Sequence, residues 1–371
     1  MNTNTGRRSK NREKDNPNRM TGENPVRTGE DPTEAVLSES SLNKKHLCDY
    51  VINVATGCRH GCKFCYVPST PAIRTRGDML KEEADVDSAQ KEWGDYVLYR
   101  DGIINRIDGI LDRKQSWKKT PRGRGVVGIS FGTDCYMDGR AGKITREVVD
   151  SLSSHERYAR VLTRNPILAL QDEDVFRNAG EYVTIGSSIS SLYADRVGAI
   201  EPRAPAPEHR LEGLKKFSDM GIQTFVSMSP TYPTMTLSEM EGQLRKISEV
   251  EPSVIFHEPI NPRSGNFKMT IRAALEEGEE ELHTALNRLT SQENWLDYCL
   301  RQFTWMQHLG SKLDLPVHLW PDKRQLNLAE PDVEEWLRDW KTRQSPEDFA
   351  NRDVPSTPPP EIPDILKERY L

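Results

Sequence analysis

Short apolar runs alternate with amphipathic stretches through the central part of the chain, and this alternation limits the fold more than any other feature. Six runs have the length and composition that are typical of buried strands. They are Tyr50–Ala55, Val126–Phe131, Tyr158–Thr163, Tyr182–Ser187, Ile222–Met228 and Ser253–His257. Strands that alternate with helices form parallel βα units, so we expect an α/β fold.

Helical periodicity is found between these runs, in Ile103–Leu111, Thr145–Leu152, Leu168–Phe176, Glu208–Met220 and Ser238–Glu249. In the fourth stretch Leu211, Leu214 and Phe217 recur at helical spacing, and Gly221 follows where a C-terminal cap is needed. About six βα units suit an incomplete (β/α) barrel of about six parallel strands. An open doubly wound sheet is the alternative.

The composition predicts four regions. Residues 1–45 are polar and predict a disordered N-terminal tail. Residues 46–265 carry the partial barrel, and residues 266–341 form a helical C-terminal extension in which Leu315–Leu319 is a candidate further strand. Residues 342–371 include Ser356-Thr357-Pro358-Pro359-Pro360 and predict a Pro-rich tail.

Charge and hydropathy exclude several classes of protein. The formal net charge of -6 argues against a generally basic nucleic-acid-binding surface, although a local basic groove is compatible with it. No apolar run reaches the roughly 18 residues of a membrane span, and the N-terminal region is polar, so we expect neither a membrane anchor nor a secretory signal. The expected location is the cytoplasm.

The carboxyl ends of parallel strands carry the active site in both architectures. This rule selects six candidate segments before any motif is considered. They are Thr56–Tyr66, Gly132–Tyr136, Arg164–Asn165, Ser188–Ser190, Ser229–Tyr232 and Glu258–Arg263.

The first segment contains three of the six cysteines, Cys58, Cys62 and Cys65, in the spacing C-x3-C-x2-C. In a reducing compartment such a group indicates metal or redox chemistry. Three thiolates do not complete a tetrahedral structural zinc site, whereas on a cubane iron–sulfur cluster they leave one iron free. The alternatives are a zinc site that uses His60 as the fourth ligand, or three unconnected core cysteines.

The motif, with Phe64 just before the last cysteine, resembles the signature of the radical S-adenosylmethionine (SAM) superfamily. The resemblance implies a [4Fe–4S] cluster held by Cys58, Cys62 and Cys65, whose open iron chelates SAM. It implies reductive cleavage of SAM to a 5′-deoxyadenosyl radical that abstracts a substrate hydrogen. A reductant such as flavodoxin or ferredoxin is the implied electron donor.

Later segments are similar to the spore photoproduct lyase-like branch of that superfamily. The matching motifs are Gly57 to Tyr66, Thr133-Asp134, Thr163-Arg164, Ser188-Ile189, Glu201-Pro202 with Arg210, and Ser229-Pro230. The resemblance spans about residues 48 to 262. It implies that Thr133 and Ser188 bind the SAM amino group, that Arg164 binds its carboxylate, and that Asp134 belongs to the same cofactor-binding set. Loop-capping hydroxyls, a surface arginine and a Glu201–Arg210 pair that fixes the connector are the structural alternatives.

One departure from the branch concerns hydrogen return to the product. True spore photoproduct lyases carry a cysteine three residues before the Asp that corresponds to Asp134, and Phe131 holds that position here. Cys135 is the candidate catalytic replacement, and a small buried core residue is its alternative role. The resemblance therefore does not support repair of spore photoproduct.

Nucleic acid is the first candidate substrate, by analogy with the branch. The basic stretch Arg113–Arg124, with Trp117 in its middle, is a candidate contact surface, and a solvated linker is the alternative. Two other functions compete with this one. The first is a radical SAM enzyme that acts on a peptide or small metabolite, and the second is a non-catalytic iron–sulfur or zinc protein.

Overall fold

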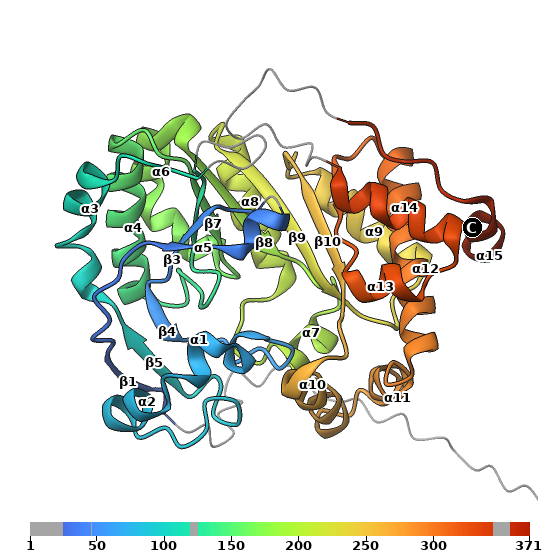
Figure 1. The fold of residues 1–371 in the computed structure, drawn as a ribbon, viewed down its shortest axis with the longest axis horizontal. Coiled ribbons are helices and arrows are strands. Elements are labelled where there is room, and N and C mark those ends of the chain that lie inside the picture. Colours follow the sequence, from blue (N-terminus) through green and yellow to red (C-terminus); the bar gives the residue numbers. More distant parts are fainter. Residues whose placement is uncertain (1–24, 46, 119–124, 344–356) are drawn as a thin grey trace, which may run out of the picture.

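The structure is a computed structural model that describes residues 25–45, 47–118, 125–343 and 357–371. Its main sheet has the strand order β11-β10-β9-β8-β7-β6-β3-β2 (Figure 1). The strands are β2 (Ser38–Glu39), β3 (Tyr50–Ile52), β6 (Val127–Ile129), β7 (Ala159–Leu162), β8 (Val183–Ser188), β9 (Gln223–Thr231), β10 (Ile255–Pro259) and β11 (Val317–Leu319). Neighbouring strands are parallel except for the antiparallel β2–β3 pair.

The expected α/β fold with a mostly parallel sheet is confirmed. Within the described residues β11 and β2 are the two edges of the sheet, which is therefore open and not closed into a barrel. Each of the six expected strand segments overlaps a strand of this sheet, and Leu315–Leu319 contains β11. In β8 all six residues are buried, and α8 (Pro207–Asp219) and α5 (Pro166–Ala169) pack against this strand.

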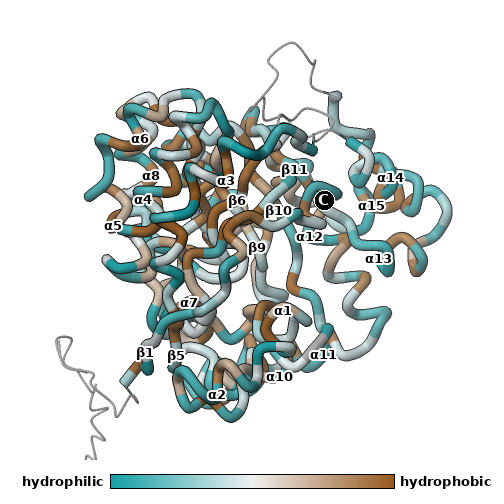
Figure 2. Tube along the Cα trace, turned by 60° about the vertical axis from the view of Figure 1, so that its left-hand side comes forward, coloured by the Kyte–Doolittle hydropathy of each residue, from teal (hydrophilic) through white to brown (hydrophobic). Residues whose placement is uncertain are grey.

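Helices follow the strands and cover the sheet. They are α3 (Ile107–Arg113), α4 (Gly139–Ser154), α5 (Pro166–Ala169), α6 (Glu173–Ala179), α7 (Ala194–Ile200), α8 (Pro207–Asp219) and α9 (Leu237–Ser248). At the end of α8, Gly221 has φ +77°, and the Ile222 amide donates to the carbonyl oxygen of Phe217, as the predicted cap requires. Figure 2 shows the apolar segments gathered in the strands and the polar segments outside them.

A second, three-stranded sheet corrects the expected N-terminal tail. Its order is β1-β5-β4, with β1 (Arg27–Glu30), β5 (Tyr96–Tyr99) and β4 (Ala55–Gly57). Residues 25–45 are thus largely structured, since β1 pairs with β5 and β2 pairs with β3, while η1 (Ser41–Lys45) connects β2 to the chain before β3. The order of this segment depends on partners far away in the sequence. Residues 1–24 lie outside the described part. Two short helices, α1 (Pro71–Arg74) and α2 (Gly77–Ala84), lie between β4 and β5.

The C-terminal part is helical, as expected, and surrounds β11. Its helices are α10 (Ser264–Glu276), α11 (Glu280–Arg288), α12 (Gln292–Lys312), α13 (Lys323–Leu328), α14 (Pro331–Thr342) and α15 (Asp364–Tyr370). The expected Pro-rich tail therefore ends in a helix. Helix α15 packs on α12, where the Trp305 indole donates to the Tyr370 carbonyl and Arg369 pairs with Asp297. Residues 344–356 lie outside the described part. Among the described helices, none has the length and apolarity that crossing a membrane requires.

Candidate active site

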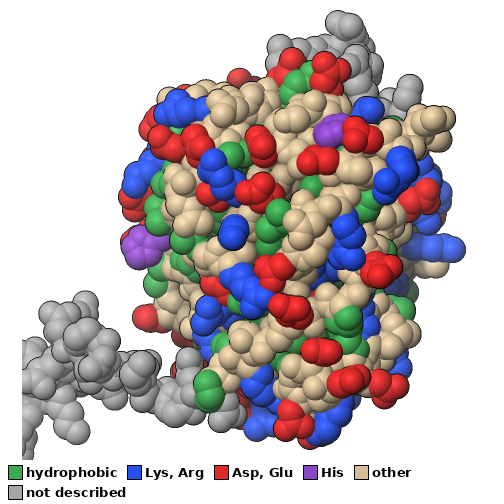
Figure 3. Space-filling model, turned by 90° about the vertical axis from the view of Figure 1, so that its left-hand side faces the viewer, with side chains coloured by type: hydrophobic (Ala, Val, Ile, Leu, Met, Phe, Trp, Pro, Cys, Tyr) green, Lys and Arg blue, Asp and Glu red, His purple; other side chains and the backbone are tan. Residues whose placement is uncertain are grey.

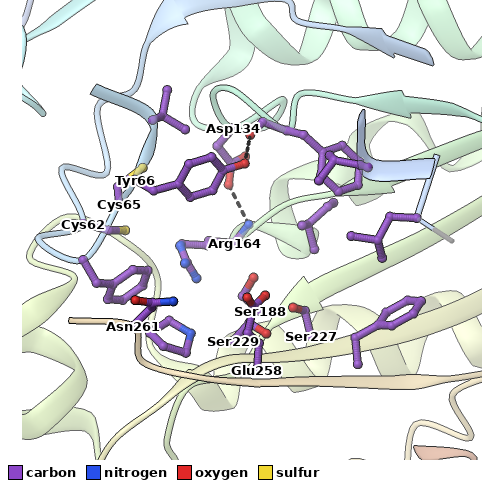
Figure 4. Close-up of a pocket in the computed structure, with 18 of the residues that line it drawn as sticks. Cys62, Cys65, Tyr66, Asp134, Arg164, Ser188, Ser227, Ser229, Glu258 and Asn261 are labelled. Atoms are coloured by element: carbon purple, nitrogen blue, oxygen red, sulfur yellow. Dashed lines mark hydrogen bonds between the residues drawn. The ribbon is translucent and has the colours of Figure 1, made fainter. Parts of the chain in front are cut away.

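A cavity of about 550 Å³ lies at the carboxyl ends of the main-sheet strands. Each of the six segments selected by the strand-end rule contributes at least one lining residue. Figure 4 shows Cys62 and Cys65 at one side of the cavity and Asp134 at another, with Arg164 between Asp134 and the side chains of Ser188, Ser227, Ser229 and Glu258.

The cysteines reach the cavity from the loop that follows β4. Gly57, just before them, has φ +94°, and a Cβ there would lie 2.3 Å from the carbonyl oxygen of Tyr96 on β5. Only glycine permits both this left-handed backbone and this close approach. The loop is further tied to α10, because the Asn266 amide donates to the carbonyl oxygen of Phe64 at 2.7 Å. Three cysteine side chains of this loop line the cavity: Cys58, Cys62 and Cys65.

Burial controls the protonation of these thiols. It raises the pKa of Cys62 to about 11 and that of Cys65 to about 12, and it raises the pKa of Cys58 well above its usual range. The proximity of Cys62 raises the pKa of the other two further. A positively charged group that binds thiolates would relieve this mutual repulsion.

The donor set suits a multi-iron cluster better than a single ion. Among the residues that the structure describes, no three His, Cys, Asp or Glu side chains converge to hold one metal ion. His60 is directed elsewhere, with Nδ1 3.1 Å from the Arg203 carbonyl oxygen and Nε2 3.3 Å from the Asp134 carboxylate. A cubane cluster instead bonds each cysteine to a different iron, so its ligands stand further apart. Neighbouring thiols that all face one cavity fit that group.

Asp134 joins the cysteine loop to the ends of β6 and β7. Burial alone would raise the pKa of its carboxyl, but His60 and hydrogen bonds from neighbouring groups hold the pKa at about 2. The carboxylate accepts hydrogen bonds from the Thr163 hydroxyl at 2.6 Å and from the Arg164 and Tyr136 amides at 2.7 and 2.9 Å. Because these contacts occupy both oxygens, Asp134 is suited to positioning neighbouring residues.

Thr133 and Ser188 both line the cavity, at the ends of β6 and β8. The Thr133 hydroxyl donates to the carbonyl oxygen of Gly57, so it also fixes the entrance of the cysteine loop. The Ser188 carbonyl accepts from Arg210 at 2.9 Å, and this bond holds the end of β8 in place.

Arg164 lies over the aromatic ring of Phe64, with 5.1 Å from its guanidinium carbon to the ring centroid. Its Nη1 atom is 3.3 Å from Oε2 of Glu201, and Nη1 of Arg210 is 2.8 Å from the same oxygen. Glu201 and Arg210 are buried and do not line the cavity. The predicted pairing of Arg210 with Glu201 is therefore confirmed. Among Arg164, Glu201 and Arg210, only Arg164 lines the cavity.

The structure does not place Cys135 in the cavity. This residue is fully buried in the core, where its Sγ lies 3.6 Å from the Leu162 carbonyl oxygen and its carbonyl accepts from the Thr145 hydroxyl. Because β6 ends at Ile129, the chain turns before Cys135 and directs this side chain inward, while Phe131 lines the cavity. The expected catalytic role of Cys135 has no geometric support.

The basic stretch also lies away from the cavity. Its described residues, 113–118, begin at the end of α3 and precede β6, at the amino end of the parallel strands, whereas the cavity is at their carboxyl ends. The Trp117 ring packs edge-on against the Tyr50 ring, with 5.1 Å between the ring centroids. The guanidinium carbon of Arg157 lies 4.7 Å from the centroid of the Trp117 ring. Residues 119–124 of this stretch are outside the described residues. Acidic and basic side chains are interspersed on the face that Figure 3 shows.

Several lining residues were not among the predicted site residues. Lys45 and Leu47 come from the segment expected to be a tail or its border, Asn266 from α10, and Ser227 from within β9. A period-two pattern in β9, in which Ser227 and Ser229 share a face, is the sequence signal that identifies Ser227. The other three reach the cavity through long-range packing.

Comparisons with known proteins agree with the cysteine motif. The model of the family described as the radical SAM superfamily matches residues 52–247, more than half of the chain. A protein of Acidianus two-tailed virus is 27% identical over 243 residues, which cover 64% of this chain and 76% of that protein. A protein of Methanocaldococcus jannaschii is 24% identical over 187 residues, 50% of this chain and 61% of its own length.

Two solved structures are similar in fold. A spore photoproduct lyase complexed with dinucleoside spore photoproduct is 14% identical with a TM-score of 0.47, covering 67% of this chain and 66% of that one. Streptococcus suis SuiB bound to S-adenosylmethionine is 10% identical with a TM-score of 0.43, covering 77% of this chain and 54% of that one.

Proposed function

Because this chain belongs to the radical SAM superfamily, we propose that it binds a [4Fe–4S] cluster through Cys58, Cys62 and Cys65 and cleaves SAM reductively in the cavity above them. The observation that carries the proposal is the placement of three neighbouring thiols on the wall of one cavity, beside Arg164. When bound, the cluster would supply the electron that cleaves SAM to methionine and a 5′-deoxyadenosyl radical, which would abstract hydrogen from the substrate. The open, mostly parallel sheet would then be the incomplete barrel of this superfamily.

The cavity residues have distinct proposed roles. Arg164 binds the SAM carboxylate, since a guanidinium can grip a carboxylate through two donors. Ser188 ends β8 and Thr133 follows β6, the strands on either side of β7, and both line the cavity, where their oxygens can accept from the SAM amino group. Phe64 stacks against Arg164 and limits the access of water to the cysteines. Asp134 holds the backbone of Arg164 and thereby positions its side chain.

The test is anaerobic reconstitution of the full chain with iron and sulfide. We expect about four irons per chain and formation of 5′-deoxyadenosine from SAM after reduction with dithionite, flavodoxin or ferredoxin. Alanine in place of Cys58, Cys62 or Cys65 should abolish the visible absorption of the cluster, while alanine at Cys48 or Cys299 should leave it intact. Loss of the cluster in Cys48→Ala would identify a fourth cysteine ligand and refute an open iron. A single bound zinc and no SAM cleavage would favour the non-catalytic alternative.

Nucleic acid is proposed as a substrate only through the resemblance to the lyase-like branch. A peptide or small metabolite is favoured by one observation, namely that the described residues of the basic stretch, 113–118, lie at the opposite end of the strands from the cavity. Nucleic-acid binding that weakens steeply with rising salt would support the first substrate class over the second. A cytoplasmic location is proposed because free thiols and an iron–sulfur cluster require a reducing compartment.

A further inference from the structure

An aromatic wall forms part of the cavity. Phe225 of β9 and Phe256 of β10 pack together with Leu47 and Leu162 in one apolar cluster, and all four line the cavity. Behind the two rings lies the buried Arg160, whose guanidinium carbon is 5.4 Å from one ring centroid and 5.5 Å from the other. Other aromatic side chains line the same cavity, among them Phe131 and Trp320. Such a wall offers a flat apolar surface on which an aromatic ring can stack.

One ion pair stands beside this wall. The Lys45 ammonium donates to both carboxylate oxygens of Glu258, each at 2.9 Å, although the two residues are 213 positions apart in sequence. Both side chains line the cavity and remain partly exposed, at 29% and 38%. Lys45 ends η1, and Glu258 is in β10, so the pair joins the N-terminal segment to the far side of the open sheet (Figure 1).

The charges that line the described cavity are balanced within the protein. Besides Lys45, the cavity has two basic residues of the Lys and Arg type, Arg164 and Arg263. Arg164 pairs with Glu201 and, in the proposed function, also holds the SAM carboxylate, and Arg263 lies 3.4 Å from Asp322. Each of these three cations already has a carboxylate partner. An anionic ligand at the aromatic wall would therefore lose its hydration and gain little electrostatic attraction in return.

We infer that the aromatic wall binds an uncharged ring of the substrate and that the Lys45–Glu258 pair determines this charge preference. The inference rests on the proposed function, because it takes this cavity to be the site where the substrate meets SAM. The charges of Lys45 and Glu258 compensate each other. A ring that carries a charged substituent therefore has no uncompensated opposite charge to pair with at this wall. Removing either partner leaves the other as an uncompensated charge beside the ring site.

Three matched probes test the inference: benzyl alcohol, benzoate and benzylamine, which differ in charge on a common ring. Their affinities are measured by ligand-observed NMR on the full chain with reconstituted cluster and saturating SAM. For the wild-type protein we expect benzyl alcohol to bind at least fivefold more tightly than either ion. Equal affinities for the three probes, or the absence of any binding, would overturn the inference.

Two charge variants make the test specific to the pair. Glu258→Gln leaves the Lys45 cation alone and should shift preference toward benzoate, whereas Lys45→Met leaves the carboxylate alone and should shift it toward benzylamine. Lys44→Met is the matched control, because Lys44 is exposed on the same turn and does not line the cavity. Shifts of equal size in the control, or no shift in both charge variants, would refute the role of the pair.

The same samples separate this inference from the proposed function. Iron content and 5′-deoxyadenosine formation report on the proposed function, and probe affinity reports on the ring site. Intact SAM cleavage without the expected probe selectivity refutes the inference alone. Thymidine is an additional neutral probe: tighter binding of thymidine than of benzyl alcohol would identify the ring as a nucleobase, and weaker binding would favour an aromatic group from a peptide or metabolite.

Discussion

Arg164 and Glu201 form an ion pair at the border of the cavity, with 3.3 Å between Nη1 and Oε2. The pair connects an arginine that faces the cavity with a carboxylate that is completely buried. Burial alone would raise the pKa of Glu201, but Arg164 and then Arg210 hold it below its usual value. Glu201 therefore stays ionised and keeps the Arg164 guanidinium in a fixed orientation.

Replacing Arg164 with alanine should weaken SAM binding and leave the iron content unchanged. The substitution removes a charge-assisted contact worth about 2–3 kcal/mol, which corresponds to an affinity loss of about 30- to 150-fold. The measurements are equilibrium SAM binding and the visible absorption of the cluster. Arg263→Ala is the control, as Arg263 lines the same cavity but pairs with Asp322. Unchanged SAM affinity in Arg164→Ala would mean that the SAM carboxylate binds elsewhere.

Replacing Arg210 with methionine should destabilise the fold strongly. Arg210 is fully buried, and its loss leaves the Glu201 carboxylate with one cation in place of two, an imbalance that typically costs about 3–5 kcal/mol. Arg272→Met is the control, because its pair with Glu276 is highly exposed and should contribute about 0.5 kcal/mol or less. Urea unfolding of both variants measures the difference, and equal losses would show that the buried network is energetically unimportant.

His257 should make the protein sensitive to mild acid. Burial lowers the pKa of its ring to about 3, so the unfolded chain binds a proton below pH 6.5 while the folded chain does not. Stability is therefore lost as the pH falls, by about 2 kcal/mol between pH 7 and pH 5 from this group alone. His257→Gln should remove that part of the pH dependence in urea unfolding. Parallel pH profiles for wild type and His257→Gln would contradict the prediction.

The protein should not repair spore photoproduct efficiently. Phe131 lines the cavity and holds the sequence position at which true spore photoproduct lyases carry their hydrogen-donating cysteine, and Cys135 is enclosed in the core. Anaerobic turnover of a dinucleotide spore photoproduct should yield 5′-deoxyadenosine without multiple-turnover release of thymines. Cys135→Ala should leave SAM cleavage unchanged. Robust repair that disappears in this variant would show that Cys135 reaches the substrate in solution.

The parts of the molecule that depend on local sequence were predictable. The main strands and the Gly221 cap follow from periodicity and turn chemistry, and the strand-end rule found most of the cavity wall. The second sheet was missed, because Tyr96–Tyr99 is a short apolar run and Arg27–Glu30 contains no hydrophobic side chain. A strand with the composition of β1 forms only because it pairs with another strand. Its partner β5 lies about 70 residues away in the sequence.

The same limit applies to the cavity. Lys45 meets Glu258 across 213 residues, and Asn266 meets the cysteine loop across 202. No periodicity encodes such contacts, since they arise only when the sheet has formed. Cys135 shows the opposite error: its position beside Asp134 suggested chemistry, but the backbone turn after β6 directs it into the core.

The pairing of β1 with β5 has a practical consequence for anyone who shortens this chain. Strand β5 lies between β1 and β4, and β4 leads directly into the three cysteines. The polar composition of residues 1–45 suggests residue 46 as a place to truncate the chain. A truncation there would remove β1 and leave an unpaired edge on β5. The strand that supports the cysteine loop would then be exposed on one side, and a protein trimmed for solubility would lose the scaffold of its own metal centre.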